Sequence, residues 1–186
     1  MVKIAILASG AGSNARNIIE HFKGNPSVEI NLIACNKAEA GVFQIAREFG
    51  IDDLLLTKDN FKQTNEFVEI LQTRGIDWVI LAGFLWLVPS HLVTAFPNRI
   101  VNIHPALLPN YGGKGMYGHF VHEAVAAAGE RESGITIHYV NEHYVEGGII
   151  FQTRVNVENC SAEEIEKRVR ALEIAHFPQV IESLIQ

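Results

Sequence analysis

The stretch Val2-Lys3-Ile4-Ala5-Ile6-Leu7-Ala8-Ser9-Gly10-Ala11-Gly12-Ser13-Asn14 decides the fold. Its first seven residues are almost all apolar, as expected for a buried strand. The small residues that follow favour a tight turn, and Ala15 to Phe22 then shows the spacing of a helix. This order of strand, glycine turn and helix predicts the start of a βαβ unit.

The same alternation continues along the chain. Further strands are expected at residues 30–35, 54–57, 78–82 and 100–103, and helices at 41–49, 60–74, 89–96 and 118–128. Two more runs, 135–140 and 149–155, are typical of an antiparallel pair, and Ser161 with Glu164 marks the start of a last helix. The sequence therefore predicts an α/β fold, with a Rossmann-like, mostly parallel sheet, helices on both faces and an antiparallel C-terminal addition.

Composition limits the possible functions. The chain has 186 residues, of which 48% are hydrophobic, and we expect one domain over residues 1–186. A formal net charge of −6 argues against binding to nucleic acid or to an anionic membrane. Cys35 and Cys160 form no C-x-x-C pattern, and no secretory or membrane-spanning segment is present. These features predict a cytoplasmic location.

The segment Asn102-Ile103-His104-Pro105-Ala106-Leu107-Leu108-Pro109 predicts a catalytic edge. Side chains two residues apart on a strand point the same way, so Asn102 and His104 can face one small volume. The Asn amide and a protonated imidazole could both donate to a carbonyl oxygen as negative charge develops on it. The alternative is structural, with the Asn capping a loop and the His packing before a proline.

The turn Gly10-Ala11-Gly12-Ser13-Asn14 predicts an anion site, because small residues admit a ligand and a helix N-terminus offers free N–H groups. The match to the dinucleotide fingerprint is weak, since Cys35 at the end of the second strand is followed by Asn36 and Lys37 rather than by an acid. A site for one phosphomonoester fits this turn better than a site for a dinucleotide. The alternative is a turn that uses glycine only for its geometry.

Together these motifs resemble the glycinamide ribonucleotide transformylases, or phosphoribosylglycinamide formyltransferases, of purine synthesis. The resemblance covers essentially the whole chain. It also rests on Leu81-Ala82-Gly83-Phe84-Leu85 and on Leu172-Glu173 before Phe177-Pro178. It implies transfer of a formyl group from the cosubstrate 10-formyltetrahydrofolate to the amine of glycinamide ribonucleotide. It also implies a nucleotide-phosphate half at about residues 1–100 and a folate and catalytic half at about residues 101–186.

The resemblance also implies roles for individual residues. Gly12, Ser13 and Asn14 would hold the phosphate, and Arg170 and Glu173 would complete the nucleotide site.

The folate would lie along Leu85, Trp86, Leu87 and Val88 and beside Asn102, with the loop around Asn141 closing over the pterin. The alternative for residues 85–88 is simple core packing. No metal is expected, because His119 and His122 do not fit the H-E-x-x-H pattern.

The sequence departs from the family at one catalytic position. The family's aspartate falls seven residues after His138 and seven before Gln152, where this chain has Val145. In the family that aspartate favours the protonated imidazole and orders a water that relays the proton, and valine can do neither. Glu146 is the adjacent carboxylate and a possible substitute, although neighbouring side chains in extended backbone point in opposite directions.

Three interpretations of Val145 remain open. The chain could be a natural enzyme that uses Glu146, an inactive relative that still binds nucleotide or folate, or an active enzyme altered at one residue. The other expected residues of the nucleotide and folate sites match the family. This favours the third interpretation, an active enzyme altered at one residue. A transferase that acts on initiator tRNA is a weaker option, because such enzymes carry a basic surface. The oligomeric state is left open by the sequence.

Overall fold

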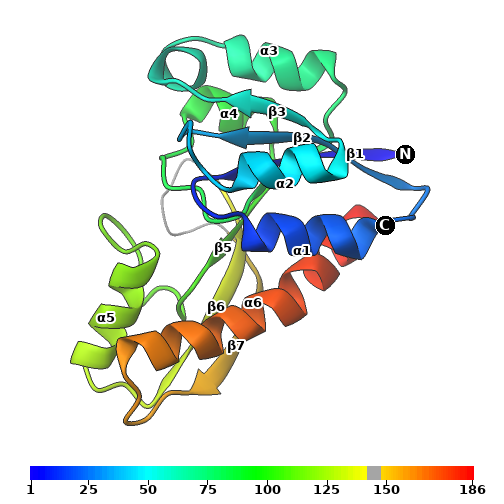
Figure 1. Ribbon diagram of the computed structural model, residues 1–186. Coiled ribbons are helices and arrows are strands. Elements are labelled where there is room, and N and C mark those ends of the chain that lie inside the picture. Colours follow the sequence, from blue (N-terminus) through cyan, green and yellow to red (C-terminus); the bar gives the residue numbers. More distant parts are fainter. Residues whose placement is uncertain (142–147) are drawn as a thin grey trace. The chain divides into compact units, whose positions relative to one another are not determined.

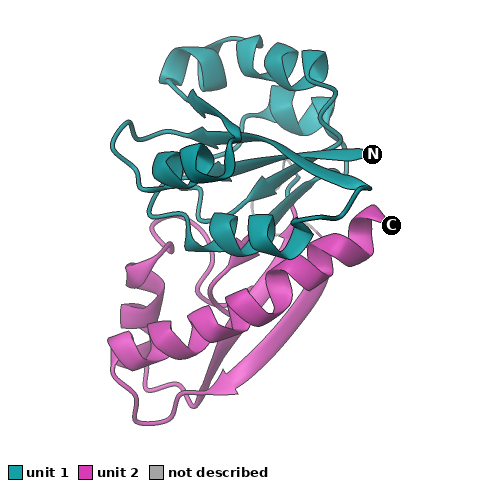
Figure 2. Ribbon diagram, turned by 45° about the vertical axis from the view of Figure 1, so that its right-hand side comes forward, with its two compact units in different colours: residues 1–102, 140–142 teal, residues 103–139, 143–186 magenta. Residues whose placement is uncertain are grey.

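The computed structural model describes residues 1–141 and 148–186, and Val145 and Glu146 therefore lie outside the described residues. The chain divides into two compact units (Figure 2). Unit 1 consists of Met1–Asn102 together with Val140 and Asn141. Unit 2 consists of Ile103–Tyr139 and residues 148–186.

Unit 1 is built on parallel strands. They are β1 (Val2–Ala8), β2 (Val28–Cys35), β3 (Asp52–Leu55), β4 (Trp78–Leu81) and β5 (Ile100–His104), whose last two residues belong to unit 2. Their hydrogen-bonded order is β3-β2-β1-β4-β5, and every one of these pairs is parallel. The apolar runs of β1 and β4 are buried because helices cover both faces of such a sheet.

Strand alternation divides the side chains of β1 between two layers. Ala5 and Leu7 join a core cluster with Phe61, Phe67 and Leu71. That cluster includes residues of α3 (Glu66–Thr73) and α4 (Ser90–Ala95). Helices α1 (Ser13–Phe22) and α2 (Val42–Phe49) pack against β2 from the other face (Figure 1). Unit 1 is thus a three-layer α/β arrangement.

Unit 2 pairs two antiparallel strands with two helices. The strands are β6 (Glu132–Tyr139) and β7 (Ile149–Asn156), and the helices are α5 (His119–Ala127) and α6 (Ala162–Ile185). Helix α6 packs on both strands through one buried stripe, formed by Ile165, Val169, Phe177 and Ile181. Ser161 Oγ accepts from Glu164 N at 3.2 Å and Glu164 Oε2 accepts from Ser161 N at 2.7 Å, which confirms the predicted capping box.

The predicted fold class is confirmed. In the described residues, seven strands form a mixed sheet that is mostly parallel and ends in the antiparallel strands β6 and β7.

The helix expected at 60–74 is wrong in its first part. A π-helical turn, η1 (Asp59–Gln63), comes first, and α3 begins only at Glu66. Asn60 Oδ1 accepts from Thr57 N at 2.8 Å, and Thr64 Oγ1 accepts from Glu66 N at 3.4 Å. Such short polar side chains compete with helical hydrogen bonding, which explains the interruption.

No helix in the described ranges is both long and apolar enough to cross a membrane.

Candidate functional site

The carboxyl ends of three parallel strands meet at one edge of unit 1. Leu7 of β1 pairs with Leu81 of β4, which in turn pairs with Asn102 of β5. The chain moves from β1 to β2 on one side and places β4 on the other, so the direction of winding changes between β1 and β4. In sheets of this type ligands bind at such a switch point, outside the carboxyl ends of the strands.

The glycine turn lies directly at this switch point. Gly12 is the N-cap residue of α1 and has a φ of 81°. A Cβ added to Gly12 would lie 2.8 Å from side-chain carbons of both Val42 and Ile45 on α2. Gly12 therefore has a geometric role in this turn.

The first turn of α1 can also receive an anion. It contains no acidic residue, no side chain caps it, and Ser13 and Asn14 are half-buried there. First-turn amides of a helix without a side-chain cap need acceptors from elsewhere. An anionic oxygen is such an acceptor, and the positive end of the helix dipole favours it.

Ser9 ties three loops together at the same edge, a role that the sequence analysis missed. Its buried hydroxyl donates to Asn36 Oδ1 at 2.6 Å and accepts from Leu85 N at 2.9 Å. Its main-chain N donates to Gly83 O at 3.1 Å. The only hint in the sequence is a hydroxyl residue directly after a buried strand.

The segment expected to hold the folate alternates in exposure. Leu85 is 39% exposed and Leu87 is 53% exposed. Val88 belongs to the core cluster, and the ring of Trp86 packs 5.9 Å from that of Phe61. Two of the four side chains therefore pack in the core, while two present apolar surface to solvent.

Asn102 and His104 share one face of β5. Both are half-buried, while Val101 and Ile103 on the opposite face are buried. This alternation follows from the twofold period of a strand.

The His104 ring is anchored within unit 2. Its Nε2 lies 2.7 Å from the main-chain O of Tyr111. Burial lowers the pKa of His104, the hydrogen bond to Tyr111 raises it in part, and His138 and His122 lower it through like charge. The neutral imidazole is therefore favoured relative to a histidine in water.

The loop after His104 is clamped by β6 and β7. Thr136 Oγ1 donates to Ala106 O at 2.7 Å and accepts from Leu108 N at 3.0 Å. Gln152 Nε2 donates to Leu108 O at 3.0 Å and to Thr136 Oγ1 at 2.9 Å. Thr136 is fully buried, and leaving these partners unpaired would cost free energy.

The remaining expected residues lie apart along the chain. Arg170 and Glu173 are on α6, where Arg170 is exposed and Glu173 is half-buried. Asn141 is an exposed residue of unit 1.

No group of three or more His, Cys, Asp or Glu side chains in the described part of the chain could hold a metal ion. His119 instead forms exposed pairs, with Glu123 at 2.9 Å and with Glu166 at 3.4 Å. The hydrogen bond to Glu166 and the charge of Glu123 raise the pKa of His119.

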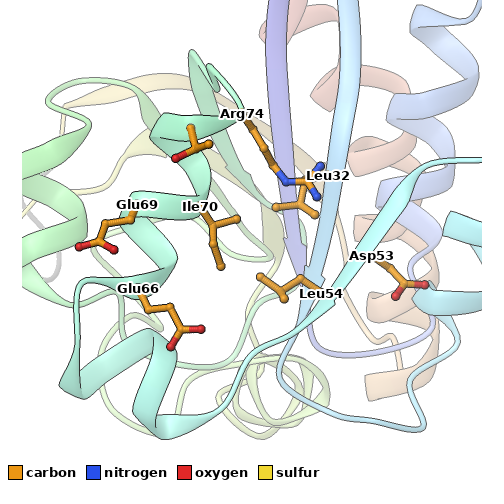
Figure 3. A pocket seen from close by; sticks show the side chains of 8 residues that line it. Leu32, Asp53, Leu54, Glu66, Glu69, Ile70 and Arg74 are labelled. Carbon is orange, nitrogen blue, oxygen red and sulfur yellow. The ribbon is translucent and has the colours of Figure 1, made fainter.

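A cavity of about 460 Å³ in unit 1 contains none of the expected site residues. It lies beside α3 (Figure 3), and its lining is Leu32, Asp53, Leu54, Glu66, Glu69, Ile70, Thr73 and Arg74. The Arg74 guanidinium is engaged by Asp52 at 2.9 Å. Three carboxylates disfavour a phosphate or a folate glutamate there, because like charges repel.

Comparison with known proteins shows which proteins this chain is similar to. The chain is 43% identical to the chloroplastic phosphoribosylglycinamide formyltransferase of Arabidopsis thaliana, over 99% of this chain and 65% of that protein. It is 33% identical to the Bacillus subtilis phosphoribosylglycinamide formyltransferase, over 100% of this chain and 95% of the relative. The chain thus spans about two thirds of the plant relative and nearly all of the bacterial one.

A solved structure shows the same fold. Glycinamide ribonucleotide transformylase 1 from Geobacillus kaustophilus superimposes with a TM-score of 0.90 and 31% identity, over 100% of both chains. The formyl transferase family matches residues 2–181. The chain therefore belongs to the formyl transferase family.

Proposed function

We propose that this protein transfers a formyl group from 10-formyltetrahydrofolate to the amine of glycinamide ribonucleotide in purine biosynthesis. The observation that carries the proposal is the placement of Asn102 and His104 on one face of β5, where β5 ends. Relatives that bear the name phosphoribosylglycinamide formyltransferase match 97% or more of the chain and support the choice of acceptor.

The chemistry requires a donor for a developing oxyanion. When the substrate amine attacks the formyl carbon, negative charge moves onto the formyl oxygen. The Asn102 amide group can donate to that oxygen, which is the kind of preorganised contact that stabilises a tetrahedral intermediate. Asn102 belongs to the paired part of β5, opposite Leu81 of β4, so its backbone is held by the sheet.

The nucleotide phosphate is assigned to Gly12, Ser13 and Asn14. The uncapped first turn of α1 and the absence of an acid in it fit an anion. The family resemblance also assigns Arg170 and Glu173 to the nucleotide. Arg170 can donate two hydrogen bonds to a phosphate, and Glu173 can accept one from a hydroxyl or an amine.

The folate cosubstrate fits the apolar surface of residues 85–88. A flat heterocycle needs apolar contacts with a few polar groups, and Leu85 and Leu87 supply exposed apolar area. Leu85 N already donates to Ser9 Oγ, so the pterin must find its main-chain donors elsewhere. Trp86 and Val88 would shape this surface from below, and Asn141 stays assigned to the pterin loop.

The runner-up is an inactive relative that still binds nucleotide or folate, because Val145 replaces the family's aspartate. Formyl transfer should be measured for this chain and for Val145→Asp, alongside calorimetric binding of glycinamide ribonucleotide to both. We expect both to bind the nucleotide and the Val145→Asp variant to turn over faster. Equal rates would show that the aspartate position is misassigned, and no nucleotide binding would overturn the proposed function.

We place the reaction in the cytoplasm and infer small-molecule substrates only. Both cysteines are free thiols, Cys35 being buried, which is usual in a reducing compartment. The net charge of −6 supports a substrate held by local contacts rather than by a broad basic surface.

A further inference from the structure

The cavity beside α3 is a feature of unit 1 that the proposed function does not use. Its volume of about 460 Å³ falls within the range of about 300–1,000 Å³ that is usual for small-molecule sites. Its lining comes from β2, β3 and α3 and not from the carboxyl ends of β1, β4 or β5. A ligand in this cavity would therefore contact none of the residues assigned to the nucleotide or to the folate.

The inner wall of the cavity is apolar. Leu32 of β2 is only 1% exposed and belongs to the core cluster, and Leu54 of β3 and Ile70 of α3 pack against that cluster. These side chains offer contact to aliphatic groups and no hydrogen bonds. The wall therefore fits the hydrocarbon part of a ligand.

Carboxylates lie on both sides of this apolar wall. Figure 3 shows Glu66 and Glu69 on α3, Asp53 on β3, and the apolar side chains between them. Within residues 1–141 and 148–186, the side chains of Glu66 and Glu69 form no hydrogen bond or ion pair. Asp53 reaches only Arg47 Nε, at 4.0 Å. The rim can thus accept positive charge from two sides.

The cation in the lining is already engaged by other residues. Arg74 Nη1 donates to Asp52 Oδ2 at 2.9 Å and to Asn31 Oδ1 at 3.4 Å. An anionic ligand would be repelled by the carboxylates of the rim, whereas a cationic ligand would be attracted. The electrostatics of the cavity therefore favour a cation.

The strength of such contacts decides which kind of cation can bind. An exposed ion pair changes an equilibrium constant by a factor of only about 1.5 to 5, so a single ammonium group would be held weakly. Two ammonium groups joined by an aliphatic chain can pair on both sides and also cover the apolar wall. For such a molecule we expect a Kd of about 1 mM.

We propose that this cavity binds an aliphatic diamine or polyamine. The chain lies on Leu54 and Ile70, one ammonium group pairs with Glu66 and Glu69, and the other pairs with Asp53. The inference goes beyond the proposed function, and its test requires no formyl transfer.

The first experiment locates the ligand. Two-dimensional ¹H–¹⁵N NMR of the whole protein, titrated with putrescine at low salt, should show saturable shifts confined to the amides of β3 and α3 and their neighbours. Butylamine, which has the same chain and one charge, should bind about fivefold more weakly or worse. No shift at about ten times the expected Kd, or shifts spread over the whole acidic surface, would overturn the proposal.

Magnesium ion is the control for charge alone, because it carries two charges and no aliphatic chain. We expect putrescine to keep its Kd when an equal concentration of Mg²⁺ is present. Displacement of putrescine by equimolar Mg²⁺ would contradict the proposal, since any divalent cation would then serve.

The carboxylates are tested one at a time. Glu66→Gln, Glu69→Gln and Asp53→Asn should each raise the Kd for putrescine by about 2- to 5-fold. Glu39→Gln removes the same charge from an exposed residue outside the lining and should leave the Kd unchanged. An equal effect of Glu39→Gln would mean that net charge and not the cavity holds the amine.

Thr73→Lys supplies an ammonium group of the protein itself. Thr73 is an exposed residue of the lining, so the substitution should preserve the fold, which circular dichroism checks. The added charge should weaken putrescine binding by about fivefold or more, whereas the neutral Thr73→Gln should not. Unchanged binding by Thr73→Lys would place the amine elsewhere.

A second copy of the chain is the competing occupant, and sedimentation equilibrium detects it. We expect Glu66→Gln to leave the oligomeric state unchanged. A dimer that Glu66→Gln disrupts and that binds no putrescine would replace the diamine by a protein partner. Because binding is read without turnover, a chain that binds putrescine and transfers no formyl group keeps this inference and counts against the proposed function. A chain that transfers the group and binds no putrescine does the reverse.

Discussion

The hydroxyl group of Thr136 donates a hydrogen bond of 2.7 Å to the carbonyl oxygen of Ala106. This contact ties β6 to the loop that follows His104, because the same hydroxyl also accepts from Leu108 N. The segment that carries the family's motif is thus held in place by Thr136, which lies 30 residues after Ala106 in the sequence.

Replacing Thr136 by valine keeps the shape of the side chain but removes the hydroxyl. Ala106 O and Leu108 N lose their partner in a buried setting, so the free energy of unfolding should fall by about 1–3 kcal/mol. We also expect a lower kcat, because the loop that begins at Pro105 would no longer be fixed. Urea unfolding and steady-state kinetics measure the two effects.

Thr136→Ser is the matched control, since it retains the hydroxyl. It should keep most of kcat even if the lost methyl group lowers stability. A Thr136→Val variant with wild-type kcat would show that the clamp does not position the catalytic loop.

Ser9→Ala should act mainly on the formylfolate cosubstrate. It removes the acceptor for Leu85 N and the donor to Asn36, so the segment that carries Leu85 and Leu87 loses its side-chain contact with Ser9, while the main-chain bond from Ser9 N to Gly83 O remains. We expect a stability loss of about 1–3 kcal/mol and a raised KM for formylfolate. The KM for glycinamide ribonucleotide serves as the internal comparison, and an equal rise in both would argue against a specific role.

Much of the fold follows from local pattern, as the buried runs of β1 and β4 and the capping box of Ser161 show. The roles of Ser9, Thr136 and the Tyr111 carbonyl do not follow, because each depends on a contact between distant segments or on a backbone atom without a side-chain signature. Periodicity also failed at Asn60, where side-chain hydrogen bonds to nearby backbone displaced the start of α3.

The candidate site was only partly accessible to sequence reasoning. The spacing of Asn102 and His104 predicts a shared face, and β5 has the burial alternation that such a face requires. The same reasoning could not separate Leu85 and Leu87 from Trp86 and Val88, because an apolar run gives no sign of which members a core will cover.

Asn102→Ala should lower kcat by about 10²- to 10³-fold, the usual loss when one oxyanion donor is removed. Nucleotide binding should change little, because the donor acts on charge that develops only in the transition state. Steady-state kinetics and calorimetry with glycinamide ribonucleotide check both parts. A large loss of nucleotide affinity with unchanged kcat would place Asn102 in substrate binding instead.

Gly12→Ala and Ser13→Ala should separate geometry from phosphate binding. A methyl group at Gly12 would contact Val42 and Ile45 too closely and would sit on a residue with φ of 81°, so stability should fall by about 1–3 kcal/mol. Ser13→Ala should leave stability nearly unchanged and raise the KM for glycinamide ribonucleotide. Thermal unfolding measures the stability of both variants, and steady-state kinetics measures their KM for glycinamide ribonucleotide. An unchanged KM in Ser13→Ala would show that Ser13 does not bind the phosphate.

Acid should destabilise the protein through its buried histidines. Burial lowers the pKa of His122, whose Nδ1 has no hydrogen-bond partner among the described residues, and burial likewise lowers the pKa of His104 and of His138. The unfolded chain therefore binds more protons than the folded chain as pH falls below about 6.5, the ordinary histidine value. Because stability rises with pH wherever the unfolded state binds more protons, the free energy of unfolding should decrease from pH 8 to pH 5.

Replacing His122 by leucine should make this decrease smaller, since one buried titrating group is lost. His119→Gln is the control of opposite sign, because hydrogen bonding to Glu166 raises the pKa of His119 and its stabilising pairs exist only when the ring is charged. The His119→Gln variant should therefore lose more of its free energy of unfolding at low pH than the unchanged protein. Urea unfolding at pH 8, 6.5 and 5 for the three proteins measures these differences, and an unchanged pH dependence in His122→Leu would show that His122 becomes protonated without cost in the folded state.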